Sequence, residues 1–266
     1  MHYLNRHQSS IPGDLWERID AAAASAATDR LTARRFLDLE GPYGVGLTSV
    51  EVGADHYCRE PAEGEAGAVA SQAISVPMIR KECGLSARRL EAHQGMGQPL
   101  DLSPVEDAAE AVAAREEEFI YQGEPKFGLE GLMTAADRHT AKVGDWSKVE
   151  QALKDVLAAV EKLETAGFHG PYALAVSPKL YNNLFRRYDG TDMLQLEHLK
   201  RLCELGVFKA PIEGAVVVDP HVGRIILGQD VMVGYSGNDG IHHQLYVSES
   251  AVLKLEEPRA ICTLTA

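Results

Sequence analysis

Few side chains in the sequence combine the type and spacing that catalysis or metal binding requires. His242 and His243 are the best pair of metal ligands, but neighbouring side chains on a strand point to opposite faces, so the two cannot easily bind one ion. Cys203 could act as a nucleophile only beside a base and an orienting group, and the leucines that flank it at helical spacing indicate a core position. We therefore predict no metal site and no catalytic residue.

The remaining chemical candidate is acidic. Glu116, Glu117 and Glu118 lie in the C-terminal half of a predicted helix, where the helix dipole disfavours negative charge. A basic residue or a metal ion would stabilise such a cluster. The alternative is that the three carboxylates face solvent on an ordinary helix surface, and the sequence leaves both possibilities open.

The local motifs of common enzymes are also missing. The glycines form neither G-x-G-x-x-G nor G-x-x-x-x-G-K-[ST], and the chain has no G-x-S-x-G and no H-E-x-x-H. A formal net charge of -13 argues against binding along a phosphate backbone, which needs a dense surface of Lys and Arg. We expect a structural or interaction protein that binds no nucleic acid.

Composition indicates a folded protein with no membrane partner. The chain has 266 residues, of which 45% are hydrophobic, and can bury a core of its own. Its first residues lack the apolar core of a secretory signal, and no stretch of about 18 apolar residues could span a bilayer. The four cysteines are widely separated and form no C-x-x-C pair, so we predict reduced thiols in a cytoplasmic protein.

The apolar spacing predicts three long helices. In the first, over residues 14–37, one apolar stripe contains Leu15, Ile19, Ala22 and Ala26. Because its alanine side chains are small, another backbone or a short peptide could approach this stripe closely. The alternative is that the stripe packs against another element of the same subunit. Ser103 as a hydroxyl cap and Pro104 at the first helical position begin a second helix that ends near Tyr121. The third begins after Asp145, includes Trp146 and stops at Gly167. The inner face of the second helix is expected to contain Val105, Ala109, Val112 and Phe119.

Three other regions have a distinct character. Residues 48–78 alternate weakly around the tip Glu60–Gly67, which predicts a long extended excursion, either an arm that reaches a neighbouring subunit or a disordered insertion. A strand over 172–176 and helical stretches over 178–188 and 193–205 form a compact α/β unit. From Gly214 onward the pattern is β-rich, and we expect one sheet to close the chain.

Short motifs in a shared order add a family resemblance. The chain resembles the family 1 encapsulins, shell proteins whose fold is similar to that of the major capsid proteins of tailed phages. The resemblance spans nearly the whole chain. It rests on Leu4, Arg6, Trp16, Ile19-Asp20, Arg34, Phe36, Asp38, Glu40-Gly41-Pro42-Tyr43-Gly44, Pro99, Asp101-Leu102-Ser103, Gly131-Leu132, Gly170-Pro171-Tyr172, Leu227-Gly228-Gln229-Asp230, Gly234-Tyr235 and Glu257-Pro258.

The resemblance implies an α+β capsid fold of the Hong Kong 97 type, with a peripheral domain, an axial domain and an extended E-loop. Residues 1–47 would be the N-terminal helix and the start of the peripheral domain. Residues 48–78 would be the E-loop, 79–144 the rest of the peripheral domain with its spine helix, 145–213 the axial domain, and 214–266 a β-rich return to the peripheral domain. About sixty copies, or a multiple, would form an icosahedral nanocompartment.

The same resemblance implies two sites. The C-terminal tail of a cargo enzyme would bind the inner wall at Ala27, Leu31, Arg34, Asp38, Asp230, Val231 and Val233. Because Ala27 stands where a relative carries a bulky aromatic residue, this pocket would be wider here. The five-fold pore would be lined by Arg186, Arg187, Tyr188, Asp189, Gly190, Thr191 and Asp192.

Cargo and cofactor follow from the family alone. Ferritin-like, hemerythrin-like and peroxidase-like enzymes travel inside relatives, which implies iron storage or oxidative-stress defence. Some relatives bind a flavin beside a tryptophan, but Leu90 stands at the matching position, so we predict no flavin and no other cofactor. A secreted bacteriocin or protease, and a soluble α/β enzyme of unrecognised class, are the alternatives.

Overall fold

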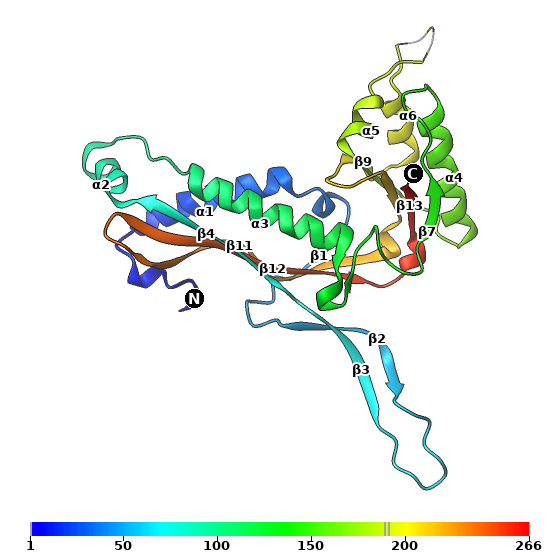
Figure 1. Cartoon of the computed structure of the whole chain (residues 1–266), viewed down its shortest axis with the longest axis horizontal. Coiled ribbons are helices and arrows are strands. Elements are labelled where there is room, and N and C mark those ends of the chain that lie inside the picture. Colours follow the sequence, from blue (N-terminus) through cyan, green and yellow to red (C-terminus); the bar gives the residue numbers. More distant parts are fainter. Residues whose placement is uncertain (1, 189, 191, 266) are drawn as a thin grey trace.

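The structure is a computed structural model that describes residues 2–188, 190 and 192–265. It has an elongated body, a second unit at one end of that body, and an arm that projects from the junction of the two (Figure 1). None of the helices in the described part of the chain is long and apolar enough to cross a membrane.

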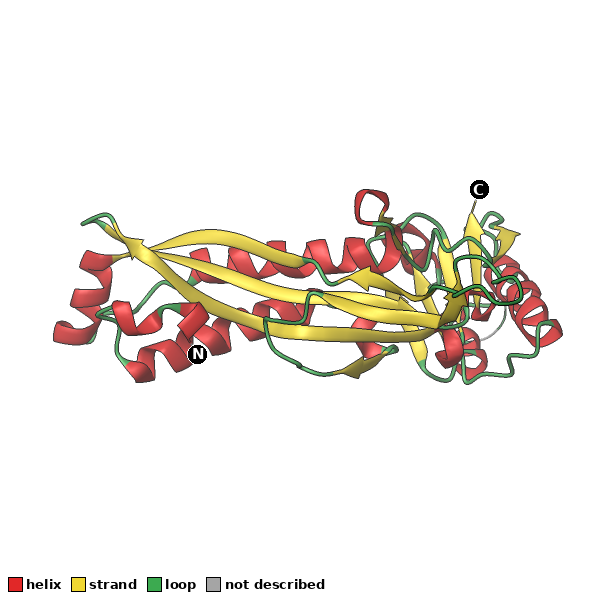
Figure 2. Cartoon of the chain, turned by 90° about the horizontal axis from the view of Figure 1, so that it is seen from below, coloured by secondary structure: helices red, strands yellow, loops and turns green. Residues whose placement is uncertain are grey.

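The body is built on a four-stranded sheet in the order β1-β11-β12-β4. Its two central strands are long: β11 (Gly223–Asn238) and β12 (His242–Leu255) pair antiparallel along most of their length. The edge strand β4 (Met78–Ser86) pairs antiparallel with β12, and the short β1 (Asp38–Glu40) runs parallel to β11. Figure 2 shows these long strands extending along the body.

Two helices bury the inner face of this sheet. In α1 (Gly13–Arg30) and α3 (Ser103–Gln122), the apolar residues recur every three or four positions. Their side chains form one core cluster with those of β4, β11 and β12, which includes Ile19, Val112, Leu85, Val233 and Leu245. The short helix α2 (Ala87–Met96) connects β4 to α3 and buries Leu90 in the same cluster.

The second unit has a five-stranded sheet in the order β7-β13-β10-β8-β9. Its strands come from three of the predicted segments, 79–144, 145–213 and 214–266, so the sheet does not follow those boundaries. The strands are β7 (His139–Lys142), β13 (Ile261–Thr265), β10 (Ala215–Val218), β8 (Ala173–Val176) and β9 (Gly206–Lys209), and the helices α4 (Gln151–Thr165), α5 (Pro178–Asn183) and α6 (Gln195–Leu202) pack around them.

The arm is an antiparallel hairpin of β2 (Ser49–Tyr57) and β3 (Val69–Ser75), which leaves the body between β1 and β4. The predicted extended excursion over 48–78 is therefore confirmed as a structural feature. The remaining elements are the small pair β5 (Gly123–Glu124) and β6 (Leu129–Glu130), and single 3-10 turns at His2–Leu4, Arg6–Gln8, Ala33–Arg35, Pro125–Phe127, Pro220–Val222 and Pro258–Ala260.

The predicted helix ends need correction. The first helix stops at Arg30, and its fully buried stripe passes through Ala23 and Ala27, whereas Ala22 and Ala26 lie at its margin. The second helix ends at Gln122 as predicted, and its inner face is as expected. Ser103 does not cap that helix, however, because its hydroxyl donates to Asp101 Oδ1 at 2.7 Å instead.

The third helix begins at Gln151, five residues later than predicted. Trp146 lies in the turn before it and is buried there, where its indole donates a hydrogen bond to Asp155 at 2.8 Å. The β-rich end of the chain does not form one closing sheet. Strands β10 and β13 complete the sheet of the second unit, whereas β11 and β12 form the centre of the body.

Candidate functional site

Six of the seven residues predicted to bind a cargo tail lie around the end of α1 and the middle of β11, whereas Asp38 on β1 is paired with Arg224, six residues along β11 from Asp230. The seven also differ greatly in exposure. Ala27 and Val233 are fully buried between helix and sheet, and Leu31 is nearly so. A docked peptide cannot touch Ala27 or Val233 in this conformation. Asp38, Asp230 and the partly buried Val231 are the members of the set that reach the surface.

Arg34 is the centre of a buried ion-pair network and is not a free pocket residue. Its Nε and Nη2 donate to the two carboxylate oxygens of Glu116 at 2.8 and 2.7 Å, and Nη1 donates to Asp230 at 2.8 Å. Nη2 also donates to Glu249 of β12. Since Glu116 and Glu249 are both essentially inaccessible to solvent, three carboxylates share one guanidinium group, two of them inside the protein.

The excess of carboxylates has an electrostatic consequence. Burial raises the pKa of Glu116 to about 7, although the nearby charge of Arg34 opposes that shift. The second carboxylate oxygen of Glu249, Oε2, is buried and has no hydrogen-bond partner. A buried oxygen without a donor is costly, so the network favours holding a proton near neutral pH.

The neighbouring Glu117 accepts hydrogen bonds from the backbone. Its Oε1 accepts hydrogen bonds from the N–H groups of Thr32 and Ala33 at 2.9 and 3.0 Å, at the start of the turn that carries Arg34. Burial raises the pKa of Glu117, while the bonds from Thr32 lower it. Glu118 is exposed and pairs with Arg115 on the same helix. The cluster thus has a basic partner at Glu116, and the alternative of a solvated face is wrong for Glu116 and Glu117.

A second anchor joins α1 to the sheet. Arg6 donates to both oxygens of Asp20 at 2.7 and 2.6 Å and to the carbonyl of Val233, and its guanidinium lies 4.6 Å from the ring centre of Trp16. These contacts join Arg6, Trp16 and Asp20 into one cluster. The spacing of these residues along the chain did not predict their contacts, because the fold brings the side chains together.

The predicted pore loop lies at the outer end of the second unit, far from the arm (Figure 1). Asp189 and Thr191 are outside the described residues. Beside them, Arg187 pairs with Asp192 at 3.0 Å, and the ring of Tyr188 lies 4.8 Å from that of His198 on α6. Arg186 donates to the carbonyl of Ser147, and Gly190 has a positive φ of 72°.

The other candidates offer no catalytic arrangement. Cys203 is fully buried in the core, and burial raises its pKa to about 12, so it is not a thiolate at neutral pH. His242 is exposed and His243 is buried, as expected for neighbours on a strand. Among the described residues, no three His, Cys, Asp or Glu side chains are placed to hold a metal ion. Leu90 is buried and presents no ring to a flavin.

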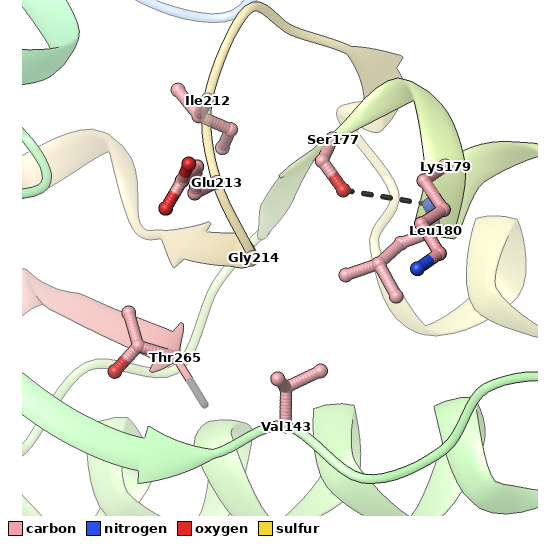
Figure 3. A pocket seen from close by; sticks show the side chains of 8 residues that line it. All are labelled: Val143, Ser177, Lys179, Leu180, Ile212, Glu213, Gly214 and Thr265. Carbon is pink, nitrogen blue, oxygen red and sulfur yellow. Dashed lines mark hydrogen bonds between the residues drawn. The ribbon is translucent and has the colours of Figure 1, made fainter.

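The second unit has an open, mainly apolar pocket with a volume of about 430 Å³. Figure 3 shows the side chains that line it. Val143, Leu180 and Ile212 provide its apolar walls, and Lys179 and Glu213 lie at its edge. The hydroxyl of Ser177 accepts a hydrogen bond from the backbone of Leu180, which caps α5. Among the described residues, no hydrogen bond or ion pair joins the side chains of Ser177, Lys179 and Glu213 to one another, so the pocket has no assembled catalytic arrangement.

Comparison with known proteins gives a consistent result. A family model described as "Encapsulating protein for peroxidase" matches residues 1–252. A type 1 encapsulin shell protein of Myxococcus xanthus is 31% identical, over 98% of this chain and 96% of its own length. A diheme-cytochrome-encapsulin shell fusion protein of Kuenenia stuttgartiensis is 33% identical, over 94% of this chain and 72% of its own length.

Solved structures agree on the fold. The virus-like particle of Pyrococcus furiosus superposes with a TM-score of 0.73 at 21% identity, and the match covers 94% of this chain and 99% of that one. The capsid of the myovirus XM1 superposes with a TM-score of 0.61 at 13% identity, over 88% and 90% of the two chains. The predicted α+β capsid fold is therefore confirmed.

Replacing Arg34 by alanine removes the cation that two buried carboxylates share. We expect Arg34→Ala to lower the free energy of unfolding by about 3–5 kcal/mol, the cost of an uncompensated buried charge. Arg35→Ala is the matched control, because Arg35 is exposed and bonds only to carbonyls at the end of α1. Denaturant unfolding of both variants measures the difference, and equal stabilities would contradict the central role of Arg34.

The raised pKa of Glu116 predicts a pH dependence. A carboxyl whose pKa is higher in the folded state binds more protons there, so its contribution to stability is complete below about pH 4.5 and is lost as the pH rises toward about 7. We expect Glu116→Gln to abolish this fall in the free energy of unfolding, whereas Glu118→Gln on the exposed face keeps it. Chemical denaturation at a series of pH values tests this, and a slope that persists in Glu116→Gln assigns the proton to another group.

Proposed function

We propose that this chain, which belongs to the encapsulin family of shell proteins, is a non-enzymatic structural subunit that assembles with copies of itself into a closed compartment around cargo proteins. The observation that carries the proposal is the family match over nearly the whole chain, combined with a capsid fold whose arm, among the described residues, packs on the body only at its base. The lack of a catalytic cluster in the described residues is consistent with a passive wall.

The named parts of the capsid fold follow from this proposal. The body would be the peripheral domain with α3 as its spine helix, the hairpin over 48–78 would be the E-loop, and the unit around residues 145–213 would be the axial domain. The loop that carries Arg186–Tyr188, Gly190 and Asp192 would surround the five-fold pore, because it lies at the outer end of that unit. Asp189 and Thr191 complete the predicted set.

Cargo is the second part of the proposal. The description of the matching family names peroxidase as the protein that is encapsulated, and the relative from Kuenenia is a fusion of a diheme cytochrome with an encapsulin shell protein. A peroxidase-like enzyme is the cargo class that we propose, with a role in oxidative-stress defence. Ferritin-like or hemerythrin-like cargo and iron storage stay predictions from the family resemblance, as does the cytoplasmic location.

The cargo tail would contact the surface-exposed members of the predicted set. Asp38 and Asp230 offer carboxylates for the polar or basic groups of an extended peptide at two separate places along β11, and Val231 offers an apolar contact next to Asp230. Arg34 would hold Asp230 in place from below through their 2.8 Å ion pair. Ala27, Leu31 and Val233 would then shape the site from within the core instead of touching the tail.

The assembly proposal makes a simple prediction about mass. Sixty copies of a 28.9 kDa chain come to about 1.7 MDa, so we expect hollow round particles of this mass or of a clear multiple. Light scattering and negative-stain imaging of the protein expressed alone provide the measurement. A species near the mass of a monomer or dimer would refute the shell and favour the alternative of an unrecognised α/β enzyme.

The cargo site is tested by loading. We expect Asp38→Ala and Val231→Ser to leave the particle mass unchanged but to reduce, several-fold, the capture of a co-expressed fluorescent protein that carries the C-terminal tail of an encapsulated peroxidase. Glu161→Ala, on the exposed face of α4, is the control. Arg34→Ala is unsuitable here because it also destabilises the subunit. Full loading of both variants would place the docking site elsewhere.

A further inference from the structure

Strand β11 is irregular where it passes the ion-pair network of Arg34. Its pairing with β12 is interrupted between Gln229 and Met232. There Asp230 and Val231 lie opposite a single residue of β12, Glu249. Two residues opposite one form a β-bulge, which disrupts the ladder locally and re-aims a side chain. The bulge therefore brings the exposed carboxylate of Asp230 close to the buried carboxylate of Glu249, so that one guanidinium group can bind both.

Two contacts hold the Asp230 carboxylate in the bulge. Its Oδ1 accepts hydrogen bonds from Arg34 Nη1 and from the backbone N–H of Val231, both at 2.8 Å. The Asp230 side chain is 56% exposed, whereas that of Arg34 is only 12% exposed. A surface carboxylate that pairs with a largely buried cation responds to the charge of the other partners of that cation.

Those other partners are two carboxylates that solvent barely reaches. Glu116 accepts from Nε and Nη2 of Arg34 with both of its oxygens, and Glu249 accepts from Nη2 as well. Three carboxylates and one guanidinium group leave two negative charges in excess, and Oε2 of Glu249 has no donor. A proton on a buried carboxylate reduces this excess, which is the physical reason for the raised pKa of Glu116.

Titratable and charged groups face Glu116 from four segments. Asp230 raises the pKa of Glu116 through its charge. Because such coupling is reciprocal, a negative charge on Glu116 must weaken the binding of the Asp230 charge by the same free energy. The groups are Glu117 and Tyr121 on α3, Arg34 and Arg35 on the turn after α1, Asp230 on β11 and Glu249 on β12.

We propose that proton binding at Glu116 sets how firmly Arg34 holds Asp230, and thereby makes docking of a cargo tail at Asp230 and Val231 dependent on pH. This inference rests on the proposed function, because it takes these two residues as part of the docking surface. While Glu116 carries the proton, Arg34 neutralises Asp230. Once Glu116 is ionised, it competes for Arg34, and Asp230 becomes free to accept from the N–H and cationic groups of the tail.

Cargo capture during reassembly tests this regulation. Full-length particles are dissociated in denaturant and reassembled at about pH 6 or about pH 8, on either side of the pKa of Glu116. The cargo is a fluorescent protein that carries the C-terminal tail of an encapsulated peroxidase, and the same protein without the tail measures non-specific capture. We expect wild-type particles to capture several-fold more tailed cargo at the higher pH, at equal particle yield.

Two matched variants assign the effect to Glu116. Glu116→Gln has no proton to release, so it should capture at both pH values the small amount that the wild type captures at the lower pH. Glu118→Gln lies two residues further along α3 on the exposed side and should keep the wild-type ratio.

Infrared spectroscopy of wild-type particles follows the proton without cargo. A protonated carboxyl group absorbs apart from a carboxylate, and most exposed carboxyl groups are already ionised at about pH 6. We expect a protonated-carboxyl band that disappears between about pH 6 and about pH 8 and is missing from Glu116→Gln.

The outcomes separate the regulation from the cargo site itself. Equal specific capture at both pH values in the wild type overturns the regulation and leaves the docking surface in place. A wild-type ratio that persists in Glu116→Gln, or the lack of a band that depends on Glu116, also overturns it. Particles that capture no more tailed than tailless cargo at either pH overturn the proposed cargo site, and the regulation with it.

Discussion

The guanidinium group of Arg34 binds carboxylates from α3, β11 and β12 at once, and thereby joins the turn after α1 to both layers of the body. Desolvating Arg34, Glu116 and Glu249 is expensive, and only mutual pairing compensates for it. This fixes how α3 lies across the sheet and where α1 must end. The arm, the second unit and the proposed cargo surface all connect to the body that this ion-pair network stabilises.

The rest of the subunit is divided between what it can bury alone and what it cannot. The body and the second unit each enclose an apolar core. The arm, by contrast, has only a small cluster at its base. A subunit with two complete cores and one poorly buried hairpin is typical of a chain that buries further apolar surface when it associates. Such a subunit can fold before assembly, and association then stabilises it further.

The sequence by itself determined the elements whose signals are local. The apolar period of three and four predicted α3 with its inner face, and weak alternation around a polar tip predicted an extended excursion over 48–78, which the structure forms as a hairpin. The order of short family motifs implied, by resemblance, a capsid fold that comparison confirmed. These properties depend on neighbouring residues or on order along the chain, so no three-dimensional information was required.

Only the tertiary structure decided how distant residues meet. It assigned Glu116 to Arg34, turned a possible solvated face into a buried network, and placed Ala27 inside the core where a docked tail cannot reach it. It also divided the strands at the β-rich end of the chain between two sheets. The sequence could not assign these strands, because the same hydrophobic pattern is compatible with either sheet. The physical reason is the same in each case: burial and ion pairing arise between segments many residues apart, and their spacing along the chain carries no record of that proximity.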